Sequence, residues 1–454
     1  MSVIDWLNEN IIWGIPMLIL FLFTGIHASV KIDFSQFNIS KLLKKTIFSI
    51  PSSGIQISEK NLSPFQTLTS TLAVTLGTGN IVALGVAVAM GGAGAVFWMW
   101  ISAFLGMATT YLENYFGMRT RKKNPDGSHF GGAFFYIEKA INKGAAVFFA
   151  ICCLLTSLGM GNLTQINAMS DALNRSFGTP VWICGMVAAS IIGVTIFGGA
   201  KFLGEITEKI IPIISGVYIV GCLIVITLNF SEIPYIFIRI LRDAFDLRAV
   251  GGGILGSAML RGMNWGFRRG IFSNEAGLGS TVILNTMSND HSADKQGRWA
   301  MLCVFIDTIV MCTLTALVIL AAADVTESTV ANDGSGLASV AFSNALGAYA
   351  GGFVNICIAL FALATASGWA VFGTASLKYL FPKSGNKFYL LLYIACSFLG
   401  AVINLEIAWG FADLTNGLMA IPNLAAVNIL IFKTITPKTN SGQKYMYSQS
   451  ISKP

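Results

Sequence analysis

Two glycine-containing runs hold the groups of this sequence that are best suited to chemistry. The first is Gly-Thr-Gly-Asn at 77–80 and the second is Ser-Asn-Glu-Ala-Gly-Leu-Gly-Ser at 273–280, and both lie inside long apolar stretches. Glycine weakens a helix, and an unwound turn inside a membrane frees N–H groups that can hold a carboxylate and carbonyls that can hold a small cation. The runs therefore predict a binding site, with close helix packing as the alternative for the first. A nucleotide-binding glycine loop is not indicated, because no strand precedes the run.

Charged residues inside apolar stretches are costly to bury, which makes them functional candidates. Glu275 lies in the second glycine run, Arg268 and Arg269 precede it by about two turns, and Asp413 begins the last apolar stretch. We interpret these four as gate residues, with one arginine approaching Asp413 when an extracellular vestibule closes. A fixed ion pair that satisfies buried charge is the alternative.

Two further carboxylates, Glu113 and Asp307, also lie in apolar stretches. We expect them to satisfy neighbouring helices, with contact to a bound ion as the alternative. Asn162 and Asn167 are expected either to join helices by hydrogen bonds or to lie near a ligand.

The composition places all of these residues in a membrane protein. Only 11% of the 454 residues are charged, against about 25% in soluble globular proteins. Hydrophobic residues make up 54% and the mean hydropathy is +0.68. A soluble enzyme, a disordered protein and a secreted disulfide scaffold are therefore disfavoured.

Cysteine and histidine usage does not indicate a disulfide framework or a metal site. The eight cysteines all lie in apolar stretches and are expected to be small buried hydrophobic residues. His27, His129 and His291 are far apart in the sequence, so neither a metal cluster nor a cofactor is expected. The first apolar stretch follows acidic rather than basic residues, and we expect it to be a retained helix and not a signal peptide.

Apolar runs bounded by glycine, proline and charge predict an all-α protein with about eleven transmembrane helices. The second and seventh of these helices contain the two glycine runs and are expected to be broken there. The predicted ranges are 11–28, 64–91, 94–117, 146–172, 180–198, 208–229, 252–288, 299–323, 350–380, 388–404 and 410–432.

The distribution of Lys and Arg predicts the orientation. With the N-terminus outside, 22 of the 29 basic residues lie in cytoplasmic segments, as the positive-inside rule requires. The acidic loop with Asp324, Glu327 and Asp333 is then extracellular, and the C-terminus is cytoplasmic. The net charge of +7 is thus a topology signal, and no nucleic-acid partner is indicated. The cytoplasmic segments are 29–63, 118–145, 199–209, 289–298, 378–387 and the C-terminal tail.

The positions of the two broken helices predict an inverted repeat. Without the first helix, the breaks fall in helices one and six of ten, so two groups of five must have opposite orientation. We therefore divide the chain into an N-terminal helix and linker (1–63), a core (64–432) and a tail (433–454). The first repeat covers about 64–229 and the second about 252–432. This arrangement is typical of secondary transporters, whose sites lie where the broken helices meet.

Several segments resemble the alanine or glycine:cation symporter family, and the resemblance covers nearly all of 64–432. It implies a LeuT-type fold and sodium-coupled uptake of small amino acids. Departures at Ala93, at 131–135, at 281–283 and at 370–373 leave the identity of the amino acid open. The segments are GTGNIVALGVAVAMGGAGAVFWMW (77–100), MGNLTQINA (160–168), RRGIFSNEAGLGS (268–280), FIDTIVMCTLTALVIL (305–320), LATASGW (363–369) and ADLTNGLMAIPNL (412–424).

The same resemblance implies the residues of the site. For two of these residues an alternative role stays open. Trp369 is expected either to contact substrate or to pack in the core. Thr365 is expected either to bind sodium or to donate a hydrogen bond to its own helix. The expected sodium ligands are the carbonyls of Ala73, Leu76 and Ala362 and the hydroxyl of Thr365. The expected substrate contacts are Thr78, Gly79, Gln165, Phe272, Ser273, Asn274 and Trp369.

The sequence thus predicts a plasma (inner) membrane symporter that couples Na⁺ entry to uptake of a small neutral amino acid, with no evident obligatory protein partner. Proton coupling with Glu275 as the carrier is an alternative, and so is an amino-acid sensor that does not transport. An intramembrane enzyme is disfavoured, because the three histidines lie at span ends or in loops and not in a membrane interior.

Overall fold

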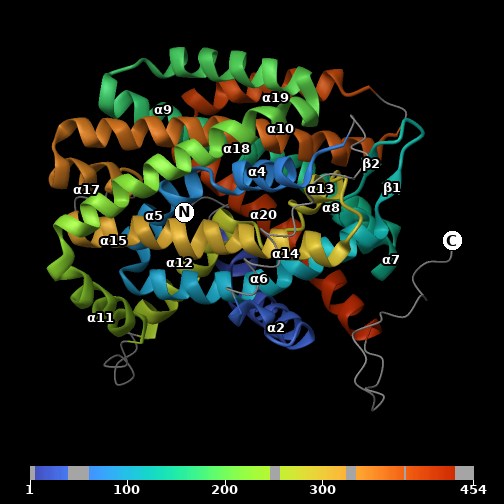
Figure 1. Cartoon of the computed structure of the whole chain (residues 1–454), viewed down its shortest axis with the longest axis horizontal. Coiled ribbons are helices and arrows are strands. Elements are labelled where there is room, and N and C mark those ends of the chain that lie inside the picture. The colour runs from blue at the N-terminus through green and yellow to red at the C-terminus, as the bar shows by residue number, and fades with distance from the viewer. Residues whose placement is uncertain (1–5, 39–60, 246–255, 324–333, 383–384, 435–454) are drawn as a thin grey trace.

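The computed structural model describes residues 6–38, 61–245, 256–323, 334–382 and 385–434. Most of these residues are helical, and the helices run mainly along the long axis of the molecule (Figure 1). The predicted all-α class is correct except for one short antiparallel hairpin, in which Lys122 pairs with Phe130. Residues 39–60 of the predicted linker, the predicted acidic loop with Asp324, Glu327 and Asp333, and residues 435–454 of the predicted tail lie outside the described residues.

The elements follow one another with short connections. They are η1 (Asn8–Ile12), α2 (Ile15–Lys31), η2 (Ser35–Phe37), α4 (Pro64–Thr75), η3 (Thr78–Asn80), α5 (Val82–Gly91), α6 (Gly94–Thr120), β1 (Lys122–Lys123), β2 (His129–Phe130), α7 (Ala133–Ala140), α8 (Lys143–Leu158), η4 (Gly159–Leu163), α9 (Thr164–Phe177), α10 (Val181–Leu228), η5 (Phe230–Glu232), α11 (Ile233–Ala244), α12 (Gly256–Asn274), α13 (Val282–Thr286), α14 (Ala293–Val304), η7 (Phe305–Cys312), α15 (Thr313–Ala322), α17 (Leu337–Leu346), α18 (Ala348–Leu380), α19 (Lys387–Val402) and α20 (Leu405–Lys433).

Fewer helices pass a length and hydropathy criterion for membrane spans than the eleven predicted. Among the described residues, seven helices are long and apolar enough, or eight when the bent pair α4 and α5 counts as one span. The predicted helix at 252–288 is interrupted between α12 and α13, and α19 is apolar but short. The predicted helices at 180–198 and 208–229 are both contained in α10.

The connection predicted at 199–209 is helical except at Gly199, which has φ 73° and ψ −174°. A straight helix of 48 residues would be about 72 Å long, more than twice the ~30 Å hydrocarbon core of a bilayer. The kink at Gly199 therefore supports two spans joined by a single glycine. Sequence patterning missed this because a glycine with positive φ needs no polar loop around it.

Among the described residues, three α-helices lie outside the predicted spans. α7 is largely buried beside the β-hairpin, α11 is amphipathic, and α17 precedes α18. In Figure 1, α7 and the hairpin lie at one end of the molecule and α11 and α17 at the other. These helices cap the two ends of the bundle.

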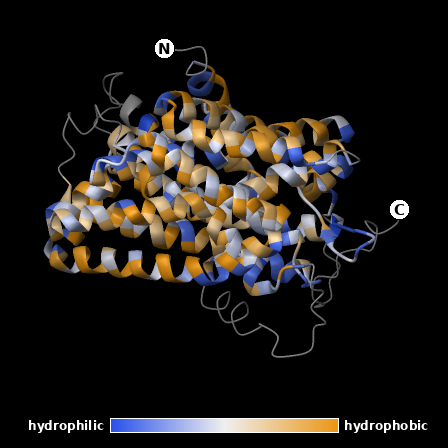
Figure 2. Ribbon diagram, turned by 90° about the horizontal axis from the view of Figure 1, so that it is seen from above, coloured by the Kyte–Doolittle hydropathy of each residue, from blue (hydrophilic) through white to orange (hydrophobic). Residues whose placement is uncertain are grey.

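The sides of the bundle are apolar. Large side chains such as Val194, Phe197 and Ile213 on α10 are 67%, 68% and 65% exposed, and Figure 2 shows mainly hydrophobic colour along the helices. This surface suits contact with lipid. All eight cysteines are free and seven are buried.

Candidate binding site between two broken helices

The first broken helix consists of α4 and α5, which are bent by 53° relative to each other. α4 begins with a capping box, in which Ser63 and Gln66 exchange 3.1 Å hydrogen bonds, and with Pro64 at its first position. The break lies at Leu76 and Gly77, between α4 and η3. A Cβ at Gly77 would lie 2.6 Å from Thr365 Oγ1 and 2.9 Å from Gln165 Oε1. Glycine is required at this position because side chains of two other helices approach the backbone.

The second broken helix consists of α12 and α13, which are separated by residues 275–281. Glu275, Gly277 and Gly279 have φ values of 57°, 87° and 71°. Positive φ is ordinary for glycine but strained for glutamate. Asn274 stabilises the turn, since its Oδ1 accepts a 3.0 Å hydrogen bond from the N–H of Ala276.

The two breaks contact each other. A Cβ at Gly79 would lie 2.8 Å from Ser273 Cα, so the second glycine of the run allows the backbone of η3 to touch α12. Asp307 bridges the breaks from η7: its Oδ1 accepts a 2.7 Å hydrogen bond from Asn80 Nδ2, and its Oδ2 accepts a 3.0 Å bond from Ser273 Oγ. Asp307 was expected to accept hydrogen bonds from neighbouring helices, and it does so from residues at the two breaks.

Gln165 reaches the first break from α9. Its Oε1 accepts hydrogen bonds from the N–H of Thr78, at 3.1 Å, and from the Thr78 hydroxyl, at 3.0 Å. Its Nε2 donates to the carbonyl of Met160 at 3.1 Å. The N–H of Thr78, which was expected to hold a substrate carboxylate, thus faces an amide oxygen that a carboxylate could replace.

Thr365 on α18 contacts the carbonyl end of α4. Its hydroxyl donates to the carbonyls of Ala73, at 2.8 Å, and Val74, at 3.1 Å. These bonds cross between helices, unlike the bond to its own helix that was the alternative. The structure thus brings the hydroxyl of Thr365 to the carbonyl of Ala73, as expected, and also to the carbonyl of Val74, which was not named from the sequence. Ala362, one turn before Thr365, is also buried.

Glu275 is held by hydrogen bonds from two sides. Trp369 Nε1 donates to Oε1 at 2.9 Å and Ser280 Oγ donates to Oε2 at 2.5 Å. Trp369 is fully buried and packs edge-on against Phe372, with ring centroids 4.9 Å apart. The position of Trp369 is therefore compatible with both of its expected roles, packing in the core and contact with a substrate at the second break.

Three of the four predicted gate residues, Arg268, Arg269 and Asp413, form a buried cluster about two turns from the break. The fourth, Glu275, lies in the break itself and does not join this cluster. Asp413 bonds to Arg268 through Oδ2 and lies 3.4 Å from Arg269 Nη1 through Oδ1. Arg269 also lies over the ring of Trp409 at 4.2 Å. Phe272, expected to contact substrate, stacks on Trp409 with centroids 4.7 Å apart, so the structure places its ring with this cluster.

Several polar residues of the site were not singled out from the sequence. Asn80 could have been found, since it ends the first glycine run, and its buried Oδ1 has no hydrogen-bond partner among the described residues. Thr308 receives a 3.0 Å hydrogen bond from Asn274, but nothing in the sequence marks it. Asn423 donates to Glu113 Oε1 at 2.5 Å and to the carbonyl of Gly277 at 2.8 Å, which explains how Glu113 supports the second break.

The other two polar candidates join helices. Asn162 Nδ2 donates to the carbonyl of Tyr393 at 2.7 Å. Asn167 Nδ2 donates to the carbonyl of Ile403 at 2.8 Å. Both contacts follow the interhelical alternative, which is the ordinary role of amides in membrane helices.

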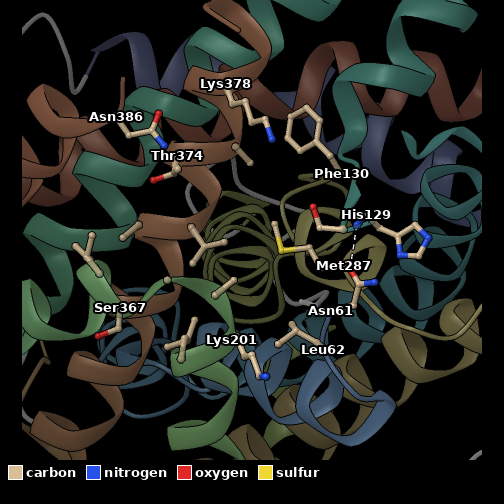
Figure 3. A pocket seen from close by; sticks show the side chains of 18 of the residues that line it. Asn61, Leu62, His129, Phe130, Lys201, Met287, Ser367, Thr374, Lys378 and Asn386 are labelled. Atoms are coloured by element: carbon tan, nitrogen blue, oxygen red, sulfur yellow. Dashed lines mark hydrogen bonds between the residues drawn. The ribbon is translucent and has the colours of Figure 1, made fainter. Parts of the chain in front are cut away.

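A cavity of about 380 Å³ opens at the end of the bundle that carries the β-hairpin (Figure 3). Its lining includes Lys201 from α10 and Lys378 from α18, and no Asp or Glu belongs to the described lining. His129 lies at its edge, where its backbone N–H donates to Asn61 Oδ1 at 2.9 Å. Burial, reinforced by the positive charges of Arg121, His291 and Lys123, lowers the pKa of His129 to about 4. The imidazole is therefore neutral at physiological pH, and the lysines make the cavity positive.

No group of three or more His, Cys, Asp or Glu able to hold a metal occurs among the described residues. The oxygens available to a cation are instead carbonyls, hydroxyls and single carboxylates. Such oxygens suit a hard monovalent or divalent cation better than a transition metal.

Comparison with known proteins finds relatives over most of the chain. The sodium/alanine symporter AgcS of Methanococcus maripaludis is 35% identical over 439 residues, which cover 94% of each chain. The probable sodium/glutamine symporter GlnT of Bacillus subtilis is 32% identical over 424 residues, covering 93% of this chain and 87% of GlnT. A crystal structure of a manganese transporter of Eremococcus coleocola shares the fold, with a TM-score of 0.51, 14% identity and coverage of 82% and 81%.

A family model provides the assignment. The model described as the sodium:alanine symporter family matches residues 1–449. The chain therefore belongs to the sodium:alanine symporter family, and it is a multi-pass membrane transporter and not an enzyme.

Proposed function

We propose that this transporter couples the inward movement of Na⁺ to the uptake of a small neutral amino acid across the plasma membrane. The observation that carries the proposal is the meeting of the two helix breaks, where Gly79 touches Ser273 and side chains of α9 and α18 converge. Paired breaks near the membrane midplane are the usual substrate and ion site of inverted-repeat transporters. The core is then a 5+5 LeuT-type repeat, with the N-terminus outside.

The substrate site is proposed to lie between the breaks. The N–H groups of Thr78 and Gly79 hold the carboxylate of the amino acid, and Gln165 moves aside to contact the substrate. Ser273 and Asn274 provide polar contacts from the second break. Trp369 closes the site on the α18 side, and its size favours a short side chain. Support comes from the Thr78–Gln165 hydrogen bonds, because they place an exchangeable acceptor on the first of these N–H groups.

The sodium site is proposed to lie between α4 and α18. Its ligands are the carbonyls of Ala73, Leu76 and Ala362 and the hydroxyl of Thr365. The 2.8 Å contact between Thr365 Oγ1 and the carbonyl of Ala73 supports this site, because two of the oxygens are already adjacent. Na⁺ bound there holds the first break in the shape that the substrate needs, so ion and substrate favour the same state.

The two ends of the protein differ in a way that supports alternating access. The buried Arg268 and Arg269 pairs with Asp413 lie on the proposed extracellular side, and the positive cavity lies on the basic, proposed cytoplasmic side. We therefore interpret the structure as closed outside, with space opening inside. Release of the pairs is then part of the change to the outward-open state.

Proton coupling is a second candidate, and one observation favours it. Glu275 lies in the second break and is 1% exposed, and its described hydrogen bonds come from Trp369 and Ser280, not from a basic side chain. A buried carboxylate in a membrane interior is costly unless it is neutralised. Protonation of Glu275 would neutralise it and could accompany transport.

One experiment tests both candidates. The purified protein is placed in liposomes, and uptake of a panel of labelled amino acids is measured with an inward Na⁺ gradient and with an equal K⁺ gradient. Sodium symport predicts accumulation of small neutral amino acids only with Na⁺. Uptake that ignores Na⁺ and is lost at alkaline pH would replace it with proton coupling, and binding without uptake in any condition would indicate a sensor.

A further inference from the structure

The N-terminal segment of residues 8–21, which precedes the proposed repeat, contacts the gate residue Asp413 directly. Trp13 is 1% exposed, and its indole N–H donates a 3.0 Å hydrogen bond to the backbone carbonyl of Asp413. One turn earlier on α20, the carbonyl of Gly410 accepts a 2.8 Å bond from Asn8 Nδ2. Two side chains of this segment thus bind the backbone on which the gate carboxylate stands.

The same segment also contacts the arginine side of the gate. Asn264 on α12 lies about one turn before Arg268, and its Nδ2 donates a 3.0 Å hydrogen bond to the carbonyl of Trp13. Trp13 therefore donates to the helix of Asp413 and accepts from the helix of the arginines. Trp13 thus connects α20, which carries Asp413, to α12, which carries Arg268 and Arg269, by hydrogen bonds that do not involve the charged side chains.

Gly417 explains how the segment approaches α20 so closely. It lies one turn after Asp413, and a Cβ at this position would overlap Ile12 and lie 3.6 Å from Trp13 Nε1. Any larger residue would push the N-terminal segment away from the Asp413 carbonyl. The glycine is not required by the backbone, since no positive φ is found there.

The segment also reaches the second helix break. The rings of Trp13 and Phe21 stack with centroids 6.0 Å apart. Phe21 in turn packs on the break, where a Cβ at Gly277 would lie 2.5 Å from Phe21 Cε1. A continuous set of contacts therefore runs from Asp413 through Trp13 and Phe21 to Gly277.

We propose that residues 8–21 hold the extracellular gate closed, with Trp13 as a positioning residue that bonds to Asp413 and connects it through Phe21 to the second helix break. The inference rests on the proposed function only in calling Asp413 a gate. Packed side chains transmit movement between two sites when they have alternative arrangements. Opening of the gate then requires the hydrogen bond from Trp13 to the Asp413 carbonyl to break. Movement of the second helix break also shifts Trp13 through Phe21 and so changes the position of Asp413.

Gate opening can be measured without transport. Ala168 on α9 is 3% exposed and lies one turn beyond Gln165 on the proposed extracellular side, so an Ala168→Cys reporter should react with an external membrane-impermeant maleimide only when that side opens. The parent protein, whose eight cysteines are free, provides the background rate. The reporter is combined with Trp13→Phe, which keeps an aromatic ring and removes the donor. It is also combined with Gly417→Ala, whose added methyl group on α20 displaces Ile12 and with it the N-terminal segment.

We expect both variants to raise the external labelling rate by roughly five- to tenfold, the population change that follows from losing one buried hydrogen bond. The control is Trp6→Phe, because Trp6 belongs to the same end of the chain and is 48% exposed; it should leave the rate unchanged. Unchanged labelling in both Trp13→Phe and Gly417→Ala, at normal thermal stability, would overturn the inference. A wild-type protein that is labelled as expected but takes up no amino acid would instead count against the proposed function.

Discussion

Trp369 and Glu275 join an unbroken helix to a broken one through a 2.9 Å hydrogen bond from the indole N–H to Oε1. Glu275 has φ 57°, a left-handed conformation that a residue other than glycine rarely adopts. Ser280 bonds to the other carboxylate oxygen, so the side chain is fixed from both sides. The break is therefore maintained by α18 as well as by its own glycines.

Trp369→Phe tests whether this bond matters for binding. The change keeps an aromatic ring and removes the donor, which should cost about 1–3 kcal/mol, or roughly five- to 150-fold in apparent substrate affinity. The matched control is Trp299→Phe, because the buried indole N–H of Trp299 has no hydrogen-bond partner in the part of the chain that the structure describes. Equal affinities for the two variants, measured by uptake in liposomes, would show that the bond has no part in the site.

The sequence was informative where a feature depends on local chemistry. Glycine runs at 77–80 and 273–280 predicted the two breaks, and both are found. Charges at Arg268, Arg269 and Asp413 led us to expect a pairing, and the structure brings the three side chains together, while their role as a gate stays a prediction. Glycine placement and buried charge are informative because they impose costs that few structures can meet.

Features that depend on the packing of distant helices could not be predicted in the same way. Asp307 bonds to Asn80 and Ser273 across more than 30 residues, and its position depends on η7, a π-helix that no sequence pattern marks. The ring of Phe272 turns toward Trp409 because of stacking between helices. Such side-chain directions are decided by tertiary contacts and not by spacing along one helix.

In the cluster of Arg268, Arg269 and Asp413, we expect loss of the carboxylate to be more harmful than loss of one arginine. Asp413→Asn leaves Arg268 and Arg269 buried without their carboxylate, which typically costs about 3–5 kcal/mol, so we expect loss of uptake and of thermal stability. Arg268→Gln should be milder, because Arg269 remains 3.4 Å from the carboxylate and lies over Trp409. The paired change Arg268→Asp with Asp413→Arg should restore part of the activity.

Uptake and melting temperature should be measured for all three variants. A paired change as inactive as Asp413→Asn, with normal membrane insertion, would argue against a direct functional pairing. Arg268→Gln that is worse than Asp413→Asn would contradict the compensating role of Arg269.

His129 should make the fold less stable in acid. Burial and nearby positive charges lower its pKa to about 4, from an ordinary value of 6.5. The unfolded chain therefore binds a proton between pH 6.5 and pH 4 that the folded protein does not, and stability falls as pH decreases through this range. Replacement by an uncharged residue removes this contribution.

We expect His129→Gln to lose less stability than the wild type between pH 7 and pH 4, with little difference above pH 7. The measurement is the melting temperature in detergent at half-unit pH steps. His27→Gln is the control for a histidine outside the cavity. Parallel curves for His129→Gln and the wild type would mean that His129 titrates at its ordinary pKa.

The sodium site gives the most direct test of ion coupling, because a single hydroxyl can be removed without a change of shape. Thr365 Oγ1 lies 2.8 Å from the carbonyl of Ala73 and 3.1 Å from that of Val74. Thr365→Val keeps the branched side chain and deletes the oxygen. Loss of one ligand should cost about 1–3 kcal/mol, which is roughly five- to 150-fold in the half-saturating Na⁺ concentration.

Two matched variants separate ligand loss from disturbed packing. Thr365→Ser keeps the hydroxyl and should retain most of the Na⁺ affinity. Thr195→Val removes a buried hydroxyl that bonds only within its own helix in the described contacts, at 2.8 Å from the carbonyl of Ile191, and should leave Na⁺ dependence unchanged. If Thr365→Val also leaves it unchanged at normal expression, this hydroxyl is not a ligand. If Thr365→Ser is as weak as Thr365→Val, the methyl group is needed as well as the oxygen, because valine keeps the branch without the oxygen and serine keeps the oxygen without the methyl.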